Sequence, residues 1–142
     1  MKPRHEAAFM QCAEAFADLS YSTRLKVGCV IVKDASIVAT GWNGMAHGAD
    51  NVCEDEEGNT KPDCIHAEDN ALRKLTKSTA SAIGGTCFVT HATCKLCAQR
   101  LIDAGIMEVI YKYPYRNTEG LNLLSRMGII VRQYQPVTKE AV

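Results

Sequence analysis

Two short stretches of the sequence contain residue types that could bind a metal ion. "CIHAEDNAL" carries His66 and Glu68, and "TCKLC" carries Cys94 and Cys97. Zinc prefers nitrogen and sulfur ligands, and a catalytic zinc keeps three protein ligands and one position for water. His66, Cys94 and Cys97 would make such a set. Glu68, two residues beyond the histidine, could then act as general acid and base beside the activated water.

Each motif alone has an ordinary explanation. An H-x-E triplet can be a plain helix start, and a C-x-x-C pair can be a redox pair or two buried core residues. A structural zinc site with a fourth protein ligand is a further alternative, in which Glu68 only caps a helix. The combination is more specific, because H-x-E at one helix start and C-x-x-C at the next match the zinc nucleobase deaminase signature.

The composition is that of a globular domain. The 142 residues have a formal net charge of zero and include seven cysteines. Proteins that grip long nucleic acids usually carry a basic excess, so a neutral chain favours a small-molecule substrate. An odd number of cysteines argues against a disulfide framework. The sequence has no long apolar run and no signal peptide at its start, which predicts a cytoplasmic protein.

Apolar periodicity predicts an alternation of helices and strands. Helices are expected over 5–19, 66–75, 94–104 and 118–127, and strands over 27–32, 37–42, 86–90, 107–112 and 129–134. Residues 43–64 are polar and aperiodic, which indicates a long loop. Thr93 is the expected N-cap of the third helix, and Gly105 and Gly128 are expected to end the last two. The order predicts one domain over 1–142, a three-layer α/β/α sandwich with a mixed five-stranded sheet. The two helices that carry the metal ligands should lie on one side of the sheet and follow neighbouring strands.

The motifs resemble those of the cytidine/deoxycytidylate zinc deaminase superfamily. "HAE" and "CKLC" carry this likeness, and "STRLKVGCVIVKDASIVATGWNG", "CED" and "YPYRNTEGLNLLSRMGIIV" resemble the deoxycytidylate (dCMP) deaminase branch. The likeness covers roughly residues 22–134. It implies hydrolysis of dCMP to dUMP and ammonia, which would feed dTMP synthesis. The sequence departs from the family pattern at Thr93, where the family has a proline.

The resemblance also implies roles for individual residues. Asn43 is expected to bind the sugar hydroxyl, the backbone around Ala67 the base carbonyl, and the carbonyl of Ala92 the exocyclic amine. The candidates for the 5′-phosphate are Arg24, Tyr115 and Arg116, with Lys26 as a secondary candidate. A guanidinium suits a phosphate because it donates two parallel hydrogen bonds, although each arginine could also be a solvated surface charge.

Members of this branch are often homohexamers that dCTP activates and dTTP inhibits, with Mg²⁺ on the triphosphate. The resemblance places an effector pocket beside the "GWNG" loop, and the candidate effector residues are Lys26, Gly41, Trp42, Gly44 and His47. The acidic run 54–57 could lie near the magnesium or be a solvated loop. Some relatives hold a second zinc, for which Cys53 and Cys64 are candidates, joined by His5 or Cys12.

Two neighbouring activities remain open. A tRNA adenosine deaminase shares "GWN" and "HAE" but would be expected to show a basic face. A free cytidine or cytosine deaminase would need no phosphate clamp, so that Arg24 and Arg116 would be dispensable.

Overall fold

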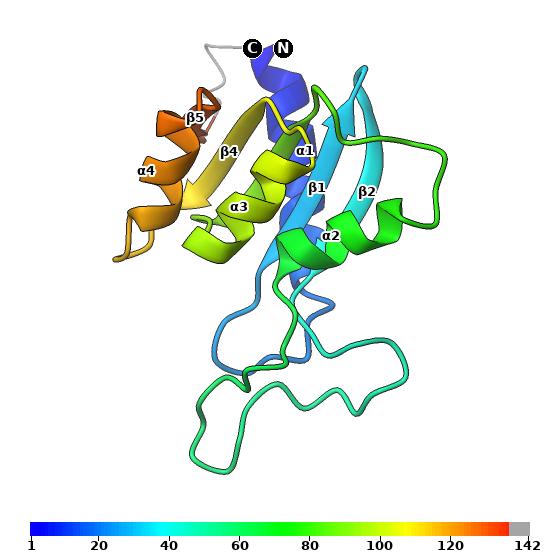
Figure 1. Cartoon of the computed structure of the whole chain (residues 1–142), viewed down its shortest axis with the longest axis vertical. Helices are drawn as coiled ribbons and strands as arrows, with labels where there is room; N and C mark the ends of the chain where they lie inside the picture. The colour runs from blue at the N-terminus through cyan, green and yellow to red at the C-terminus, as the bar shows by residue number, and fades with distance from the viewer. Residues whose placement is uncertain (137–142) are drawn as a thin grey trace.

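The computed structural model describes residues 1–136. A central five-stranded sheet has the order β2-β1-β3-β4-β5, with β1 antiparallel to both neighbours and β3, β4 and β5 mutually parallel. Helix α1 covers one face of the sheet, and α2, α3 and α4 cover the other (Figure 1). The elements are α1 (Pro3–Ala17), β1 (Gly28–Lys33), β2 (Ser36–Trp42), α2 (Ala67–Leu75), β3 (Thr86–His91), α3 (Lys95–Asp103), β4 (Glu108–Tyr113), α4 (Glu119–Arg126) and β5 (Ile130–Gln133). The predicted three-layer sandwich with a mixed sheet is confirmed.

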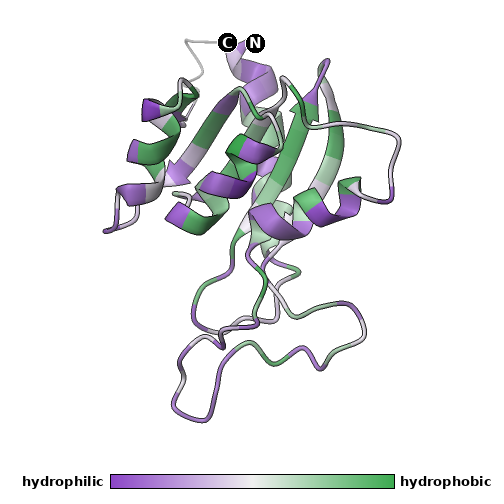
Figure 2. Cartoon of the chain, in the orientation of Figure 1, coloured by the Kyte–Doolittle hydropathy of each residue, from purple (hydrophilic) through white to green (hydrophobic). Residues whose placement is uncertain are grey.

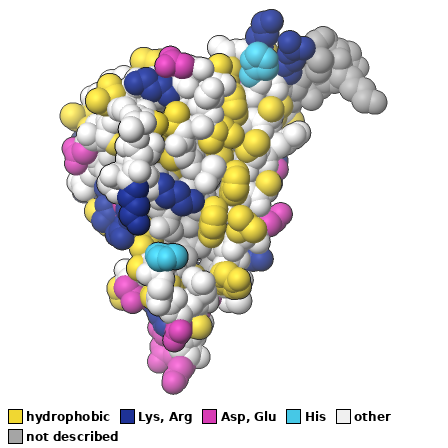
Figure 3. Space-filling view, turned by 90° about the vertical axis from the view of Figure 1, so that its right-hand side faces the viewer, with side chains coloured by type: hydrophobic (Ala, Val, Ile, Leu, Met, Phe, Trp, Pro, Cys, Tyr) yellow, Lys and Arg dark blue, Asp and Glu magenta, His cyan; other side chains and the backbone are white. Residues whose placement is uncertain are grey.

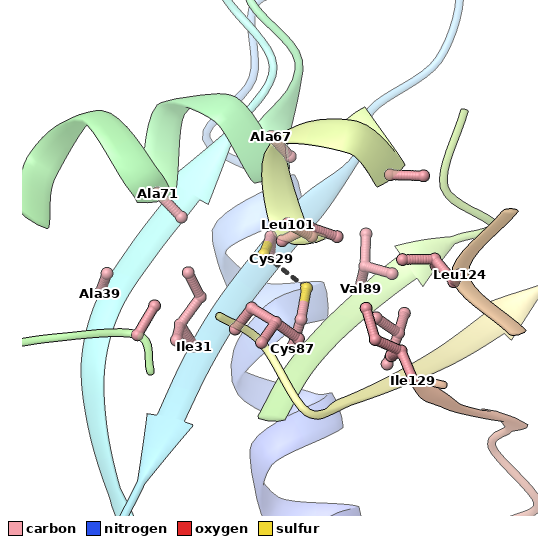
Figure 4. Packing of buried hydrophobic residues seen from close by; sticks show 14 residues of the cluster. Cys29, Ile31, Ala39, Ala67, Ala71, Cys87, Val89, Leu101, Leu124 and Ile129 are labelled. Atoms are coloured by element: carbon pink, nitrogen blue, oxygen red, sulfur yellow. Dashed lines mark hydrogen bonds between the residues drawn. The ribbon is translucent and has the colours of Figure 1, made fainter. Parts of the chain in front are cut away.

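The core is divided by the sheet into two layers. Successive side chains of a strand point to opposite faces, so β1 places Cys29 and Ile31 under α2 and α3 and places Val30 under α1. Strand β1 in the middle of the sheet is hydrophobic along most of its length, whereas β4 ends in hydrophilic residues and the helices carry hydrophilic outer faces (Figure 2). Figure 4 shows the layer under the helices, where the sulfur atoms of Cys29 and Cys87 lie 3.4 Å apart. These two cysteines are core residues.

The predicted elements are all present, and their ends shift by about two residues or less. Gly105 and Gly128 follow α3 and α4 with φ of +84° and +83°, as a left-handed helix end requires. One predicted cap is wrong, because Cys94 and not Thr93 is the N-cap of α3. The sulfur of Cys94 can accept the first-turn amide hydrogen, which takes the place of the expected hydroxyl cap.

The two ligand-bearing helices lie on the same side of the sheet, as predicted, but they do not follow neighbouring strands. Helix α2 follows β2 and α3 follows β3, and β1 lies between these strands. The reason is the tight β1–β2 hairpin, which turns at Asp34 and Ala35 with φ of 51° and 61°. Because β2 occupies one edge of β1, β3 must pair with the other edge.

Residues 43–66 form the predicted long loop, with only two isolated bridges, Gly44–Ile65 and Glu54–Thr60. This segment and the α1–β1 connection extend together below the sheet (Figure 1). Acidic side chains gather at the lower tip of the molecule (Figure 3). Within residues 1–136, no helix is long and apolar enough to cross a membrane.

Candidate active site

Three potential metal ligands meet at the starts of two helices. His66 is the N-cap of α2, Cys94 is the N-cap of α3, and Cys97 lies in the first turn of α3. His66 Nδ1 lies 3.4 Å from Cys94 Sγ and 3.3 Å from Cys97 Sγ. A helix N-terminus carries a partial positive charge and unpaired amide hydrogens, which favours thiolate over thiol. Among residues 1–136, these three side chains are the one group with metal-ligand geometry.

The donor set fits a zinc ion. One nitrogen and two sulfurs match the ligand preference of zinc, and the three atoms all lie within 4.8 Å of one another. A tetrahedral zinc with bonds of about 2.0–2.3 Å holds its ligands roughly 3.3–3.8 Å apart. The two measured nitrogen–sulfur distances fall within this range. Three protein ligands leave the fourth position free, which is the arrangement of a catalytic site rather than a structural one.

Protonation of the two thiols differs strongly without a metal. The Cys97 thiol donates a hydrogen bond to the Cys94 sulfur, which is the main reason that the pKa of Cys94 falls to about 4. The same contact, with burial, raises the pKa of Cys97 above its usual range. The Cys94 thiolate also raises the pKa of His66. A metal cation would displace the remaining thiol proton, since metal ligands bind in their deprotonated form.

Glu68 lies beside this group and is almost fully buried, with 4% of its surface exposed. Burial disfavours the carboxylate and raises the pKa of Glu68 to about 7. A carboxyl group with a pKa near neutral can both accept and donate a proton at physiological pH. The position, burial and chemistry of Glu68 therefore suit the general acid and base expected from the sequence.

Close backbone contacts fix the two helix starts. A Cβ atom on Gly41 would lie 2.2 Å from the carbonyl oxygen of Ala67, so β2 packs directly against the start of α2. A Cβ atom on Gly120 would lie 2.1 Å from the carbonyl oxygen of Thr93, which brings α4 against the start of α3. Neither glycine position has room for a side chain. The close packing therefore fixes the helix starts that carry His66 and Cys94.

Thr93, which stands where the family has a proline, is buried next to these contacts. Its side chain is 1% exposed, and its hydroxyl makes no hydrogen bond of standard geometry among the described residues. It lies close enough to Glu68 to offset a small part of the rise in the pKa of that carboxyl group. The backbone of Thr93 leads into Cys94 with the ligand geometry intact. The departure from proline therefore leaves the ligand cluster assembled.

A cavity of about 310 Å³ opens beside the ligand cluster. It is lined by Ser22, Arg24, Leu25, Val27, Asn43, Thr60, Cys64, His66, Ala67, Glu68, His91, Ala92, Cys94 and Tyr115. Five of the six residues expected to bind substrate are in this set, and Arg116 is not. Glu68 lines this cavity together with two of the three potential metal ligands, His66 and Cys94.

Asn43 makes contacts that the sequence did not predict. Its Oδ1 accepts a hydrogen bond from the Val27 amide at 2.9 Å, and its Nδ2 donates to the Leu25 carbonyl at 2.7 Å. The Asn43 carbonyl accepts a hydrogen bond from the Ser20 hydroxyl. Asn43 thus holds the wall of the cavity, with one amide hydrogen left to offer a ligand.

The candidate effector residues lie outside the cavity lining. Trp42 stacks on Phe16, with ring centroids 5.8 Å apart, and Lys74 lies over its ring. Gly44 exchanges two backbone hydrogen bonds with Ile65, at 3.0 and 2.7 Å. Lys26 and His47 are exposed, and Gly41 packs against α2. Packing accounts for Gly41, Trp42 and Gly44, and an effector role for any of the five stays a prediction.

Several cavity residues were not singled out from the sequence. Ser22, Leu25 and Val27 come from the α1–β1 connection, and His91 comes from the end of β3. His91 Nδ1 lies 2.8 Å from the Thr90 hydroxyl, and its ring packs against Tyr113. Burial lowers the pKa of His91. Only the position of His91, directly before Ala92, could have marked it in the sequence.

Cys53 and Cys64 are both buried in the long loop. Burial and the neighbouring Cys53 thiol raise the pKa of Cys64 to about 12. Neither His5 nor Cys12 joins them in a ligand cluster within the described residues. Helix α1 therefore supplies no third ligand for the second zinc that the resemblance suggested.

This α/β domain presents an imidazole, two thiols and a buried carboxylate at the starts of two adjacent helices. These are the features of a zinc-dependent hydrolase. The family described as "Cytidine and deoxycytidylate deaminase zinc-binding region" matches residues 3–113, more than half of the chain. The chain belongs to this family.

Relatives and solved structures agree with this placement. The deoxycytidylate deaminase of Saccharomyces cerevisiae is 31% identical over 94% of this chain and 46% of the yeast protein. That of Mycobacterium phage D29 is 33% identical over 78% of this chain and 95% of the phage protein. The crystal structure of the dCMP deaminase from cyanophage S-TIM5 with dCMP and dUMP is 42% identical, with a TM-score of 0.91 over 94% of this chain and 98% of that chain. The chain spans about half the length of the yeast relatives that it matches.

Proposed function

We propose that this protein hydrolyses dCMP to dUMP and ammonia at a zinc ion held by His66, Cys94 and Cys97. The observation that carries the proposal is the position of buried Glu68 in the wall of a cavity that His66 and Cys94 also line. A zinc ion bound there would supply a Lewis acid that makes water a nucleophile near neutral pH. The similarity to the cyanophage enzyme, solved with dCMP and dUMP, supports the choice of substrate.

Glu68 moves the protons in this proposal. It takes a proton from the attacking water and delivers it to N3 of the cytosine. It then takes the remaining proton from the new hydroxyl group on C4 and delivers it to the amine, so that the C4–N bond breaks, ammonia leaves and the C4 carbonyl forms. The backbone at Ala67 and Ala92, which lines the cavity, holds the base carbonyl and the exocyclic amine. These contacts orient C4 of the base toward the nucleophile, so that the chain contributes positioning as well as proton transfer.

The 5′-phosphate is the part of the substrate that separates dCMP from deoxycytidine. Arg24 and Tyr115 line the cavity, and the Arg24 side chain forms none of the ion pairs found among residues 1–136. A guanidinium that is not committed to a carboxylate can donate two hydrogen bonds to a phosphate. Arg116 lies outside the lining and would reach the phosphate only as a secondary contact.

Regulation and assembly belong to the same proposal. By likeness to the family, dCTP would activate the enzyme and dTTP would inhibit it, with Mg²⁺ on the triphosphate, in a cytoplasmic homohexamer built from single-domain chains. A stripe of hydrophobic side chains on the face viewed in Figure 3 supports association, because contiguous apolar surface often marks a subunit interface. Ile37 on the edge strand β2 is 37% exposed and is one hydrophobic side chain that a subunit interface at this edge would cover.

The test is a panel of substrates given to the zinc-loaded protein, with ammonia release as the measurement. We expect turnover of dCMP and much weaker turnover of deoxycytidine, because only dCMP offers a phosphate to Arg24. Opposite effects of dCTP and dTTP on the rate would support the regulatory part. Turnover of an adenosine- or cytosine-containing oligonucleotide, with none of dCMP, would overturn the proposal in favour of nucleic-acid editing.

A further inference from the structure

Glu54 belongs to the acidic run of the long loop, yet its carboxylate is fully engaged with another segment. Its Oε2 accepts a hydrogen bond of 2.7 Å from the Ser22 hydroxyl, and its Oε1 accepts one of 3.1 Å from the Thr23 hydroxyl. The backbone amides of Thr23 and Arg24 also donate to this carboxylate, at 3.2 to 3.4 Å. These contacts lower the pKa of Glu54, the Ser22 hydroxyl most of all.

The segment that Glu54 holds is a wall of the cavity. Ser22 and Arg24 line the cavity beside the metal ligands, whereas Glu54 does not line it. The carboxylate therefore acts from behind the wall, on the backbone that carries the Arg24 side chain. Ser22 is 2% exposed, whereas Glu54 is half-buried and Thr23 and Arg24 are exposed. The contacts of Glu54 therefore lie at the surface, with the Ser22 hydroxyl as the buried one.

Two side chains of the loop 43–66 hold different parts of this wall. Asn43 binds the backbone at Leu25 and Val27, and Glu54 binds it at Thr23 and Arg24. The part of the loop that carries Glu54 is itself fixed by the bridge between Glu54 and Thr60. Without Glu54, the amides of Thr23 and Arg24 would have no protein acceptor among their described contacts.

We propose that Glu54 is a positioning residue for substrate binding, which orders residues 22–24 so that Arg24 faces the phosphate end of the nucleotide. This inference rests on the proposed function, because it assigns the long loop a role in that same site. Glu54 touches neither the metal ligands nor Glu68, so its influence falls on substrate binding and not on the chemical step. The hydrogen bonds to residues 22–24 account for a carboxylate at position 54 without a bound cation.

The test compares Glu54→Gln with Glu56→Gln. Both substitutions remove one negative charge from the same run, but the side chain of Glu56 is exposed and has no hydrogen bond among the described contacts. We expect the KM for dCMP to rise several-fold in Glu54→Gln with little change in kcat, and to stay unchanged in Glu56→Gln. A change in binding with constant kcat is the signature of a lost binding interaction rather than a lost catalytic group.

Amide hydrogen exchange gives a second measurement that does not depend on activity. The amides of Thr23 and Arg24 should exchange faster in Glu54→Gln than in the wild type, and at the wild-type rate in Glu56→Gln. Equal KM values for the two variants would overturn the positioning role, as would a loss confined to kcat. Unchanged exchange at Thr23 and Arg24 would show that the Glu54 carboxylate does not hold these two amides. A wild-type protein that binds zinc but does not deaminate dCMP would overturn the proposed function. The exchange experiment would still decide whether Glu54 holds the amides of Thr23 and Arg24.

Discussion

Glu68 is the only carboxylate among the described residues that line the cavity. It is buried next to the thiol and imidazole ligands, and its burial raises the pKa toward neutrality. A glutamine at this position would keep the shape of the side chain but could not accept a proton from water. This isosteric change therefore separates proton transfer from metal binding and folding.

We predict that Glu68→Gln lowers kcat for dCMP by about 10²- to 10⁴-fold, the usual contribution of general acid–base catalysis. Zinc content, measured by atomic absorption, and the melting temperature should stay close to those of the wild type. Glu56→Gln is the matched control and should keep full activity. Near-normal ammonia release by Glu68→Gln would show that another group transfers the protons.

At the scale of elements, the geometry of the metal site depends on how α2 and α3 are held against each other. Asp69 on α2 accepts a hydrogen bond of 2.8 Å from Arg100 on α3, and it also pairs with Arg73 one turn away on its own helix. Both arginines bind the same carboxylate oxygen. Only the Arg100 pair crosses from one ligand-bearing helix to the other.

We predict that Arg100→Gln weakens zinc binding by roughly two- to fivefold, the range of a partly exposed ion pair. Arg73→Gln removes the same charge and should leave the zinc affinity nearly unchanged, because its ion pair lies within one helix. Competition with a chelator measures both affinities. Combining Arg100→Gln with Asp69→Asn should add little further loss, since the two groups form one interaction. Equal losses in Arg73→Gln and Arg100→Gln would point to a general charge effect instead.

Helix α4 fixes the other side of the ligand cluster through Gly120. A methyl group at this position would clash with the carbonyl oxygen of Thr93 at 2.1 Å and with the carbonyl carbon of Cys94 at 2.6 Å. Gly120→Ala should therefore move Cys94, reduce the bound zinc and destabilise the protein by about 1–3 kcal/mol, as overpacking does. Ser125→Ala in the exposed part of the same helix is the control. Unchanged zinc content and melting temperature in Gly120→Ala would contradict the close contact.

The sequence predicted the elements well and the contacts between them less well. The continuous apolar run "VGCVIV" and the H-x-E and C-x-x-C motifs are local, so the sheet and the ligand cluster could be anticipated. The order of β1 between β2 and β3 depends on long-range pairing, which no local pattern contains. The clamp formed by Glu54 joins residues about 30 positions apart. Nothing in a run of four acidic residues distinguishes this one from its solvated neighbours.

At the scale of the whole molecule, the zinc site connects parts of the chain that are distant in sequence. His66 and Cys94 are 28 residues apart, and each begins a helix that covers the same face of the sheet. A ligand that binds only the folded chain stabilises it by mass action. Metal binding at such a junction should therefore stabilise the entire domain and not only the two helix starts.

We predict that removing zinc with a chelator lowers the melting temperature by roughly 10 °C relative to protein with free zinc 100-fold above its dissociation constant. At that concentration, zinc binding adds about 2.7 kcal/mol to the free energy of unfolding. Divided by the unfolding entropy of a chain of this size, this corresponds to a change of roughly 10 °C in the melting temperature. Calorimetry with and without zinc measures the difference, and His66→Ala should show almost none, because two thiols alone bind the ion weakly. A structural ion would be needed for folding, so a chain unfolded without zinc would favour the structural alternative. A folded, zinc-free protein that regains both stability and dCMP turnover on adding zinc is the result expected of a catalytic centre built on a preformed sheet and two preformed helix starts.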